Sequence, residues 1–260
     1  MPVVLVEKQM PQITLLTLNR PERRNALTVE LMAELTTAIE NANADPQQRI
    51  LILRGAGKAF CTGLDLEEAV KVDPQTTAEN VARLLLAVAE TRLVTIAMVH
   101  GAAVAGGAGL MSACDFAIAA ERTRFGYPEV RRGLVAGLVM TFIRRQLRER
   151  DLREVLLASE LFDAERAREI GLINRVVPSG DLETAVQKLA ASVLQGAPGA
   201  ITNSKRLMEE LWSTSVREDI EAALRHHLTA RESAEAREGI AAFNEKRPPN
   251  WAPQQSQSAN

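Results

Sequence analysis

Glu129 is the residue in this chain whose setting most favours acid/base chemistry. It follows Pro128 in the segment TRFGYPEVRRGL, between Gly126 and Gly133. A positioned carboxylate can take up and release a proton when its pKa lies near the working pH. A glutamate directly after a proline is more often a solvated residue at a helix start, so other segments must support the role.

Two earlier glycine-rich loops can present backbone N–H groups to a ligand. The first covers residues 55–65 and includes Gly63, and the second runs from Gly101 to Gly109. Glycine adopts backbone conformations closed to other residues, and small side chains let a ligand approach a helix start, where free N–H groups favour negative charge. The second loop lacks the patterns of a P-loop and of a dinucleotide site. The first loop alone is equally consistent with a plain surface turn.

Metal-ligating and nucleophilic residues are few and scattered. The two cysteines, Cys61 and Cys114, lie in unrelated segments without the paired spacing of a zinc site. His226 and His227 are adjacent on a predicted helix and point apart, while His100 ends a predicted strand and is better explained as structural. We therefore expect no metal and no cofactor, and reduced thiols typical of a cytoplasmic protein.

The charge balance argues against a nucleic-acid or membrane partner. With 31 Lys+Arg against 33 Asp+Glu the formal net charge is -2, which provides no general attraction to polyanions. The N-terminal segment has no basic region followed by a longer apolar one, and no window is apolar enough for a membrane span.

Short β-type runs and longer helical patterns must position the three loops. Strands are expected at residues 3–7, 13–18, 50–54, 94–99, 116–119 and 173–177. Helices are expected at residues 28–44, 77–91 and 164–169, and then without intervening strands at 182–194, 200–212, 216–231 and 233–243. The alternation predicts an α/β core followed by a helical region.

Several motifs in order along the chain resemble the crotonase, or enoyl-CoA hydratase/isomerase, superfamily. The central one is VHGAAVAGGAGLMSACDFAIAAERTRFGYPEVRRGL. It is supported by NRPERRNALT, GKAFCTGLDL, FDAERAREIGLINRVVP and FNEKRPP, which together extend the resemblance over nearly the whole chain.

The resemblance implies a crotonase-like spiral of ββα units, an α/β fold, with a C-terminal all-helical trimerisation region. We place the acyl-CoA-binding core at residues 1–196 and the oligomerisation region at residues 197–260. It further implies an enzyme, of isomerase or lyase type, that acts on acyl-CoA thioesters as in fatty acid metabolism and assembles as a homotrimer or a hexamer.

The same resemblance assigns roles within the three loops. The backbone N–H groups of Leu64 and Gly106 would form an oxyanion hole for the thioester oxygen, and Glu129 would be the acid/base. Negative charge develops on that oxygen when the α-carbon loses a proton, and fixed donors stabilise it.

One acid of the family pattern is missing. Similar hydratases carry two glutamates, and the positions here are Gly109 and Glu129. Moving a double bond from the 3 to the 2 position needs one base, whereas adding water is work that two carboxylates share. We therefore favour isomerisation modestly over hydration, and expect Gly109→Glu to raise hydration if the acid is what is lacking.

Two observations keep alternatives open. Asp65, Glu67 or Glu68 is near enough in sequence to replace the missing acid. The segment LVAGLVMTFIRRQL departs from the glycine-rich stretch of related hydratases, which leaves the shape of the acyl pocket open. A non-catalytic acyl-CoA-binding or scaffold protein is the alternative of another class.

Basic residues within the family-like motifs are candidates for binding CoA. These are Arg23, Arg24, Lys58 and Lys246, together with Gly63 in the first loop. In relatives the motif that contains Lys246 approaches the CoA of a neighbouring subunit. Each of these side chains is as well explained as a solvated surface charge.

Overall fold

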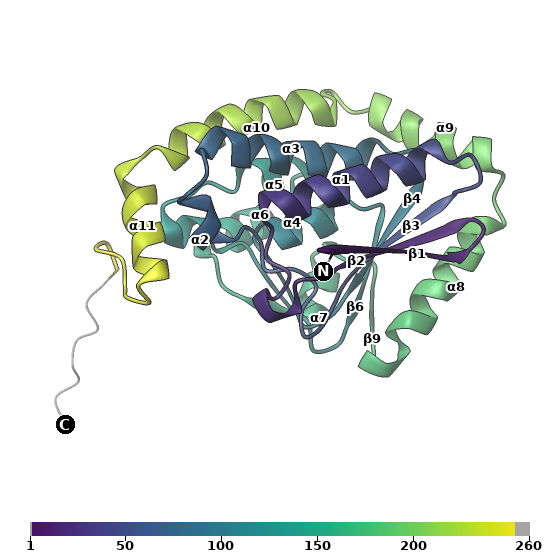
Figure 1. Ribbon diagram of the computed structural model, residues 1–260, viewed down its shortest axis with the longest axis horizontal. Coiled ribbons are helices and arrows are strands. Elements are labelled where there is room, and N and C mark those ends of the chain that lie inside the picture. The colour runs from purple at the N-terminus through teal and green to yellow at the C-terminus, as the bar shows by residue number, and fades with distance from the viewer. Residues whose placement is uncertain (1, 253–260) are drawn as a thin grey trace.

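The computed structural model describes residues 2–252, and its strands form two sheets (Figure 1). The main sheet has six strands in the order β1-β2-β3-β4-β6-β9, and the smaller sheet has three in the order β5-β7-β8. The strands are β1 (Val4–Met10), β2 (Ile13–Leu18), β3 (Ile50–Gly55), β4 (Val94–Val99), β5 (Ala102–Val104), β6 (Phe116–Ala120), β7 (Arg124–Gly126), β8 (Phe162–Asp163) and β9 (Arg175–Val177). In the main sheet only β1 and β2 pair antiparallel.

Helices surround the sheets and fill the C-terminal region. Those within the core are α1 (Val29–Ala44), α2 (Leu66–Ala69), α3 (Pro74–Glu90), α4 (Gly106–Ser112), α5 (Gly137–Ile143), α6 (Glu149–Arg153) and α7 (Ala164–Glu169). Those that follow are α8 (Leu182–Leu194), α9 (Pro198–Glu210), α10 (Val216–Arg231) and α11 (Ala234–Asn244). Short helical turns are η1 (Pro21–Arg23), η2 (Pro128–Arg132), η3 (Glu154–Ala158) and η4 (Ser179–Asp181). No helix of residues 2–252 is long and apolar enough to cross a membrane.

The main sheet is apolar on both faces because helices cover both. In β3, Ile50 and Ile52 point towards α8, whereas Leu51 and Leu53 belong to the larger core with α1 and α3. Successive side chains of a strand point to opposite faces, so a continuous apolar run such as ILIL marks a strand buried on both sides. Figure 1 shows α1, α3 and α10 side by side over one face and α8 over the other.

In each of two pairs, β4 with β5 and β6 with β7, strands that follow each other in the sequence lie in different sheets, as a spiral of ββα units requires. β4 lies in the main sheet and continues through Gly101 into β5 of the smaller sheet, which leads into α4. β6 and β7 repeat the arrangement, and a bridge between Cys61 and Ala103 lets the first loop extend the smaller sheet. The predicted crotonase-like α/β fold is thereby confirmed.

The predicted elements agree with most of this architecture. The strands at 13–18 and 94–99 and the helices at 164–169, 182–194 and 216–231 have the expected bounds. The helix expected at 77–91 begins earlier, at Pro74, because the side chain of Asp73 accepts a hydrogen bond from the Thr76 N–H at 2.8 Å and caps it. The strand expected at 173–177 is shorter because only Arg175–Val177 pairs with β6.

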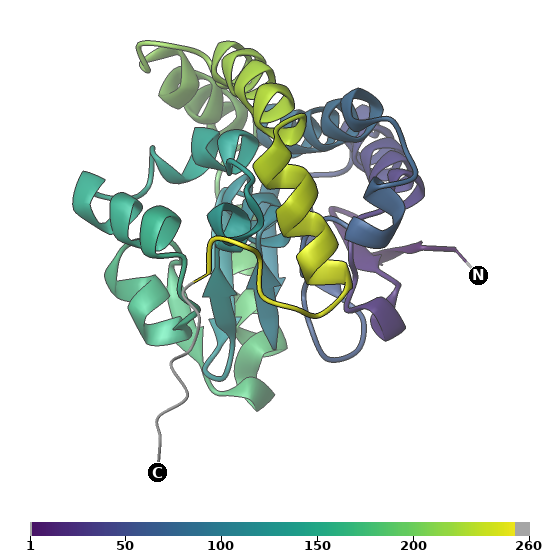
Figure 2. The same cartoon turned by 90° about the vertical axis from the view of Figure 1, so that its left-hand side faces the viewer.

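The C-terminal helices lie against the core and cover one end of it. α10 packs along α3 and α5, and α11 packs on η2 and α2. Figure 2 faces this end and shows α11, in yellow, lying across it. Helices far along the chain therefore close the end of the molecule where the loops meet.

Candidate active site

A cavity of about 900 Å³ lies between the three predicted loops and the C-terminal helices. It is lined by Leu64 from the first loop, Gly106 from the second and Glu129 from the third. α2, α3 and α5 add apolar residues such as Leu66, Val81, Leu138 and Val139. Segments far apart in the sequence, from Glu22 to Lys246, thus meet at one cavity.

Glu129 lies in this cavity with a carboxylate oxygen that has no partner. η2 begins with Pro128, whose fixed φ suits a helix start, and is capped at its end by Gly133, whose φ is +66°. Glu129 is 9% exposed, and its Oε2 forms no hydrogen bond with the described residues. Burial raises the pKa of Glu129 to about 7, although its own backbone N–H and the charge of Arg132 lower it.

The backbone N–H groups of Leu64 and Gly106 lie close together and are both free of partners in residues 2–252. The Leu27 N–H donates to the Gly63 carbonyl at 2.8 Å and the Asp65 N–H to the Leu27 carbonyl at 2.9 Å, which leaves the Leu64 N–H between them without an acceptor. Gly106 is the first residue of α4, so its N–H has no acceptor within the helix. A methyl carbon placed on Gly106 would lie 3.8 Å from the Leu64 nitrogen.

A strained residue fixes the orientation of the Gly106 N–H. Ala105, which joins β5 to α4, has φ +51° and ψ −129°, a backbone conformation that residues other than glycine rarely adopt. Its N–H donates to the Gly126 carbonyl at 2.8 Å, and Gly63 packs so closely that a Cβ there would lie 2.9 Å from the Ala105 Cβ. The two loops therefore hold each other in place.

Asn25, in the motif NRPERRNALT, supports the first loop from below. Its Nδ2 donates to the carbonyls of Ala56, Ala59 and Phe60 at 2.8 to 3.1 Å, and its Oδ1 accepts the Arg20 N–H at 2.9 Å. Asn25 is fully buried, so these bonds satisfy a side-chain amide that water cannot reach. The motif positions the loop that carries Leu64.

The position of the missing second acid is occupied by another side chain. Gly109 is buried in α4, and a Cβ built on it would lie 2.7 Å from Cγ2 of Val139, on α5. Val139 is 5% exposed and lines the cavity, and its β-branch leaves it little freedom to turn away. A glutamate at position 109 would therefore press its Cβ against Val139, so the expected gain of a second acid from Gly109→Glu depends on a change at Val139.

The three carboxylates considered as substitutes are all engaged elsewhere. Asp65 caps α2 and pairs with Arg20 at 3.2 Å and with Arg23 at 3.4 Å, and these bonds lower its pKa despite its burial. Glu67 pairs with Arg23 at 2.8 Å, and the Oε2 of Glu68 accepts the Val29 N–H at 3.1 Å. Glu129 alone has an unpartnered, buried carboxylate oxygen among the described residues.

The basic candidates for CoA binding do not all reach the cavity. Arg23, Arg24 and Lys246 line it, and Lys246 does so in its own chain. Gly63 lies directly behind Leu64 with φ +85°. Lys58 is exposed and is not among the lining residues; its carbonyl instead faces Gly101, where a Cβ would lie 1.8 Å from it.

Two polar residues of the cavity were not found from the sequence. Arg132 lies over the ring of Phe243 at 4.3 Å and lines the cavity near Glu129. His227 lines it from α10, with Nδ1 3.4 Å from the Val135 carbonyl, and burial lowers its pKa. Ile220 and His227 lie seven residues apart on α10 and share one helix face, but only the fold shows that this face closes the cavity.

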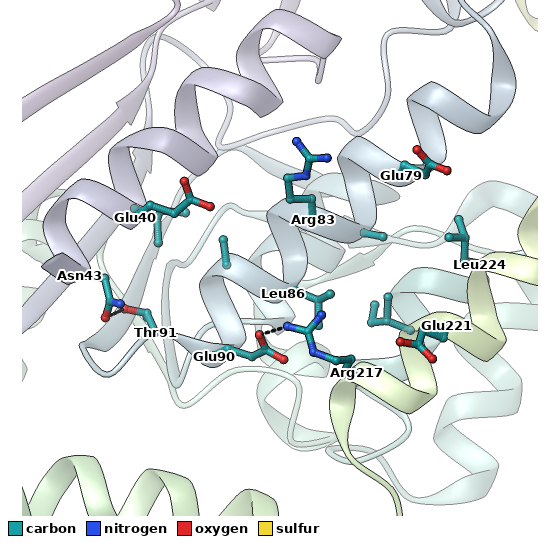
Figure 3. Close-up of a pocket in the computed structure, with 14 residues that line it drawn as sticks. Glu40, Asn43, Glu79, Arg83, Leu86, Glu90, Thr91, Arg217, Glu221 and Leu224 are labelled. Atoms are coloured by element: carbon teal, nitrogen blue, oxygen red, sulfur yellow. Dashed lines mark hydrogen bonds and ion pairs between the residues drawn. The ribbon is translucent and has the colours of Figure 1, made fainter.

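A second hollow, shown in Figure 3, lies between α1, α3 and α10. Its charged residues include an ion pair of Arg217 with Glu90 at 2.5 Å, and Asn43 accepts a hydrogen bond from the Thr91 hydroxyl at 2.8 Å. Arg217 and Glu90 are half exposed, at 56% and 43%. These paired and solvated groups provide no candidate acid or base.

Neither a metal-binding cluster nor a reactive thiol is found in residues 2–252. No group of three or more His, Cys, Asp or Glu side chains gathers there as a metal site would require. Cys61 donates to the Asn25 carbonyl at 3.1 Å, and burial raises its pKa to about 12. Burial likewise raises the pKa of Cys114, so neither thiol is a ready nucleophile.

Comparison with known proteins agrees with the geometry. A family model described as Enoyl-CoA hydratase/isomerase matches residues 8–254. A Thermus thermophilus protein assigned by name as an enoyl-CoA hydratase is 36% identical over 253 residues, covering 95% of this chain and 100% of the relative.

Two crystal structures from Mycobacterium avium are similar over almost their whole length. An enoyl-CoA hydratase is 35% identical with a TM-score of 0.83, covering 96% of this chain and 99% of that one. A carnitinyl-CoA hydratase is 32% identical with a TM-score of 0.85, covering 96% and 98%. The chain therefore belongs to the enoyl-CoA hydratase/isomerase family.

Proposed function

We propose that this protein is an acyl-CoA enzyme that stabilises a thioester enolate, with Glu129 as its single acid/base. The observation that carries the proposal is the free Oε2 of a buried Glu129, in the same cavity as the unpartnered N–H groups of Leu64 and Gly106. A pKa of about 7 suits a group that must both accept and return a proton near neutral pH.

The two N–H groups would hold the thioester oxygen. When the α-carbon loses its proton, negative charge moves onto this oxygen, and fixed donors in a dry cavity can contribute roughly 3 kcal/mol each to the transition state. The strain at Ala105 and the contact with Gly63 keep the donors in place before substrate binds. This arrangement needs no cofactor beyond the CoA of the substrate.

Isomerisation of a 3-enoyl-CoA to a 2-enoyl-CoA is the reaction that one carboxylate performs most simply. Glu129 removes a proton from C2, the electrons of that bond form C2=C3, and the former C3=C4 pair takes the proton back at C4. No atom is gained or lost. The Val139 side chain packs against Gly109, the position of the second acid, and Asp65, Glu67 and Glu68 are engaged elsewhere; both observations favour this one-base reaction.

Hydration of a 2-enoyl-CoA is the second candidate, favoured by the names of the relatives. It forms a C–O bond at C3 and a C–H bond at C2, and Glu129 would have to serve both the water and the α-carbon. An acyl-CoA-binding protein without turnover is the third possibility. Assembly as a homotrimer or hexamer is proposed with all three, and sedimentation of the purified protein tests it.

A paired turnover assay tests the proposal. The parent protein is assayed with a 3-enoyl-CoA and a 2-enoyl-CoA of the same chain length, and we expect faster turnover of the 3-enoyl-CoA. Glu129→Gln should lower activity on both by about 100-fold or more. Glu121→Gln, on an exposed residue, is the matched control and should retain activity.

Each outcome separates the candidates. Faster turnover of the 2-enoyl-CoA would make hydration the main reaction, and binding of both thioesters without turnover would favour the non-catalytic alternative. Full activity of Glu129→Gln on both substrates would remove Glu129 from the mechanism.

A further inference from the structure

A guanidinium held on an aromatic ring lies beside the candidate base. Cζ of Arg132 is 4.3 Å from the ring centroid of Phe243 on α11, and both residues line the cavity together with Glu129. Arg132 is half-buried, and its guanidinium forms no ion pair or hydrogen bond with the residues from 2 to 252. A cation is attracted to the electron-rich face of an aromatic ring. Phe243 is therefore the side chain that holds this guanidinium.

The geometry of η2 places Arg132 and Glu129 on the same side. η2 is a 3-10 helix, in which three residues make one turn and side chains three apart lie one above the other. The charge of Arg132 is close enough to lower the pKa of Glu129. Nevertheless the guanidinium lies on Phe243, and Oε2 of Glu129 has no partner among the described residues.

An ion pair between these two groups would make Glu129 a weaker base. An opposite charge in contact lowers the pKa of a carboxyl group by about 1–3 units, and a paired oxygen is less free to reach a substrate proton. Glu129 is buried and Arg132 half-buried, so without the ring their attraction would draw the guanidinium onto the carboxylate. The ring therefore has an effect on the base that it does not touch.

α11 is packed on η2 closely enough to fix the position of the ring. A Cβ placed on Gly239 of α11 would lie 2.4 Å from the carbonyl carbon of Arg132, and one on Gly133 would lie 2.4 Å from that of Glu235. Two backbones can approach so closely only where glycine leaves out the side chain. Figure 2 shows α11 lying across this end of the molecule.

Two other ionisable side chains near Glu129 are neutral at pH 7. Tyr127 precedes η2, and burial raises the pKa of its hydroxyl. His227 faces the cavity from α10, and burial lowers the pKa of its ring. Neither group can therefore replace the charge of Arg132.

The charged groups around η2 also act elsewhere. Glu154 of η3 pairs with Arg166 at 2.7 Å, and Glu235 of α11 is exposed. Within the cavity lining, Asp65 and Glu67 both pair with Arg23. The remaining charged residues of the lining are Glu22, Arg24, Arg124, Arg131 and Lys246. Among the described residues, Arg132 is the one whose charge lowers the pKa of Glu129.

We propose that Phe243 of α11 holds the Arg132 guanidinium beside Glu129 but apart from it, so that Arg132 is a positioning residue that favours the ionised base without pairing with it. The proposal rests on the proposed function and deepens it. It gives the C-terminal helix α11 a part in the chemistry of the cavity.

Profiles of kcat/KM from pH 5 to 9 test the proposal, with whichever enoyl-CoA the parent turns over. Arg132→Gln removes the charge, Phe243→Leu removes the ring and keeps an apolar side chain, and Phe243→Tyr keeps the ring. Arg131→Gln is the matched control, because it removes a cation of the same turn that donates to the Ala158 carbonyl at 3.1 Å. Thermal unfolding checks that each variant is folded.

We expect the acid limb of the profile to move in opposite directions in the two main variants. Arg132→Gln should move it to higher pH by about 1 unit, because a nearby positive charge is lost. Phe243→Leu should move it to lower pH by about 1 unit or more and lower the plateau about 10-fold, because the released guanidinium pairs with the base. Phe243→Tyr and Arg131→Gln should leave the acid limb where the parent has it.

The double variant Arg132→Gln, Phe243→Leu shows whether the ring acts through the guanidinium. Its acid limb should match that of Arg132→Gln alone. A further loss in the double variant would overturn the proposal, since Phe243 would then act by touching the substrate. An unmoved acid limb in Arg132→Gln, or a rise in KM alone, would also overturn it, the latter because Arg132 would then be a substrate contact.

A titration without substrate separates this proposal from the proposed function. If the parent turns over no enoyl-CoA, the proposed function fails, and the carboxyl group of Glu129 can still be titrated by NMR of protein labelled with ¹³C in its glutamate carboxyl groups. Glu129→Gln identifies the signal of Glu129. A midpoint that rises in Arg132→Gln and falls in Phe243→Leu supports the proposal, and a midpoint that either substitution leaves unmoved overturns it.

Discussion

At the scale of single residues, the environment of Glu129 couples its chemistry to the stability of the fold. The carboxyl group is buried among apolar neighbours, and burial raises its pKa from 4.5 to about 7. Such a group is a stronger base than an exposed glutamate, because its charged form is less well stabilised. The same effect makes ionised Glu129 a cost to the folded state.

The pH dependence of activity should report this pKa. If Glu129 must be ionised to remove the α-proton, kcat/KM should fall about 10-fold per pH unit below pH 7 and level off above it. Steady-state assays from pH 5 to 9, with a buffer series of constant ionic strength, measure the profile. An acid limb that stays flat down to pH 5 would contradict a raised pKa at the essential base.

Stability should depend on pH in the opposite sense to activity. Between pH 4.5 and 7 the folded state keeps the Glu129 proton longer than the unfolded chain does, so the contribution of Glu129 falls as pH rises through this window. At pH 8 Glu129→Gln should therefore be more stable than the parent by an amount on the order of 3 kcal/mol, and nearly equal at pH 4.5. Urea unfolding at both pH values tests this; a variant less stable at pH 8 would count against it.

Gly109 and Val139 decide whether a second acid can be introduced. Gly109→Glu alone brings a Cβ within 2.7 Å of Val139 and should destabilise the fold by about 1–3 kcal/mol without adding hydratase activity. The double variant Gly109→Glu, Val139→Gly makes room for the carboxylate and should hydrate a 2-enoyl-CoA faster than Val139→Gly alone.

The matched control is Gly109→Gln, Val139→Gly, which has the same bulk without the acid. Equal hydration rates for the glutamate and glutamine versions would show that a carboxylate at this position does not contribute.

At the scale of elements, the oxyanion-hole candidates depend on two loops that touch. Gly63 has φ +85°, and a Cβ there would lie 2.9 Å from the Ala105 Cβ and 3.0 Å from the Gly106 nitrogen. Gly63→Ala should therefore displace the Gly106 N–H and lower kcat by about 100-fold, as loss of one oxyanion donor does. Gly199→Ala, at an open helical position, is the control and should retain activity.

Measured binding of a saturated acyl-CoA shows whether the cavity survives in Gly63→Ala. Retained binding with lost turnover is the expected result. Unchanged turnover would mean that the contact between the loops does not fix the donors.

The sequence predicted the long elements and the residues around the site, for physical reasons that also explain what it missed. Long runs such as ILIL in β3 and the capped, periodic α1 are specified by local pattern. The short strands β5, β7 and β8 have two or three residues each, too few to show a period, so the smaller sheet was not predicted. Glu129, Leu64 and Gly106 were found through motifs that resemble a family, and not from pattern alone.

His227 and Val139 illustrate what local pattern cannot provide. Each became informative only when α10 or α5 was placed against the cavity, since long-range packing determines which face of a helix meets the site. Lys58 shows the reverse, because a basic residue in a family-like motif lies outside the cavity lining.

At the scale of the whole molecule, the C-terminal helices pack into the same hydrophobic core as the sheet. Val216 and Ile220 of α10 belong to the same hydrophobic cluster as β2, β3 and α4, and α11 meets η2 where Gly239 lies against Arg132. A boundary near residue 197 therefore separates two regions of sequence that share one hydrophobic core.

Unfolding followed by two probes tests this continuity. The tryptophans, Trp212 and Trp251, both lie after residue 197, so their fluorescence reports on the C-terminal region, whereas far-UV circular dichroism reports on all helices and strands. Trp212 stacks on Arg145 of the core, with the guanidinium 4.9 Å from the ring. We expect coincident urea transitions for the two probes at one protein concentration, because shared burial makes the regions unfold together. A fluorescence transition at clearly lower urea would show that the C-terminal helices detach first, and the cavity that His227 and Lys246 line would then open before the core unfolds.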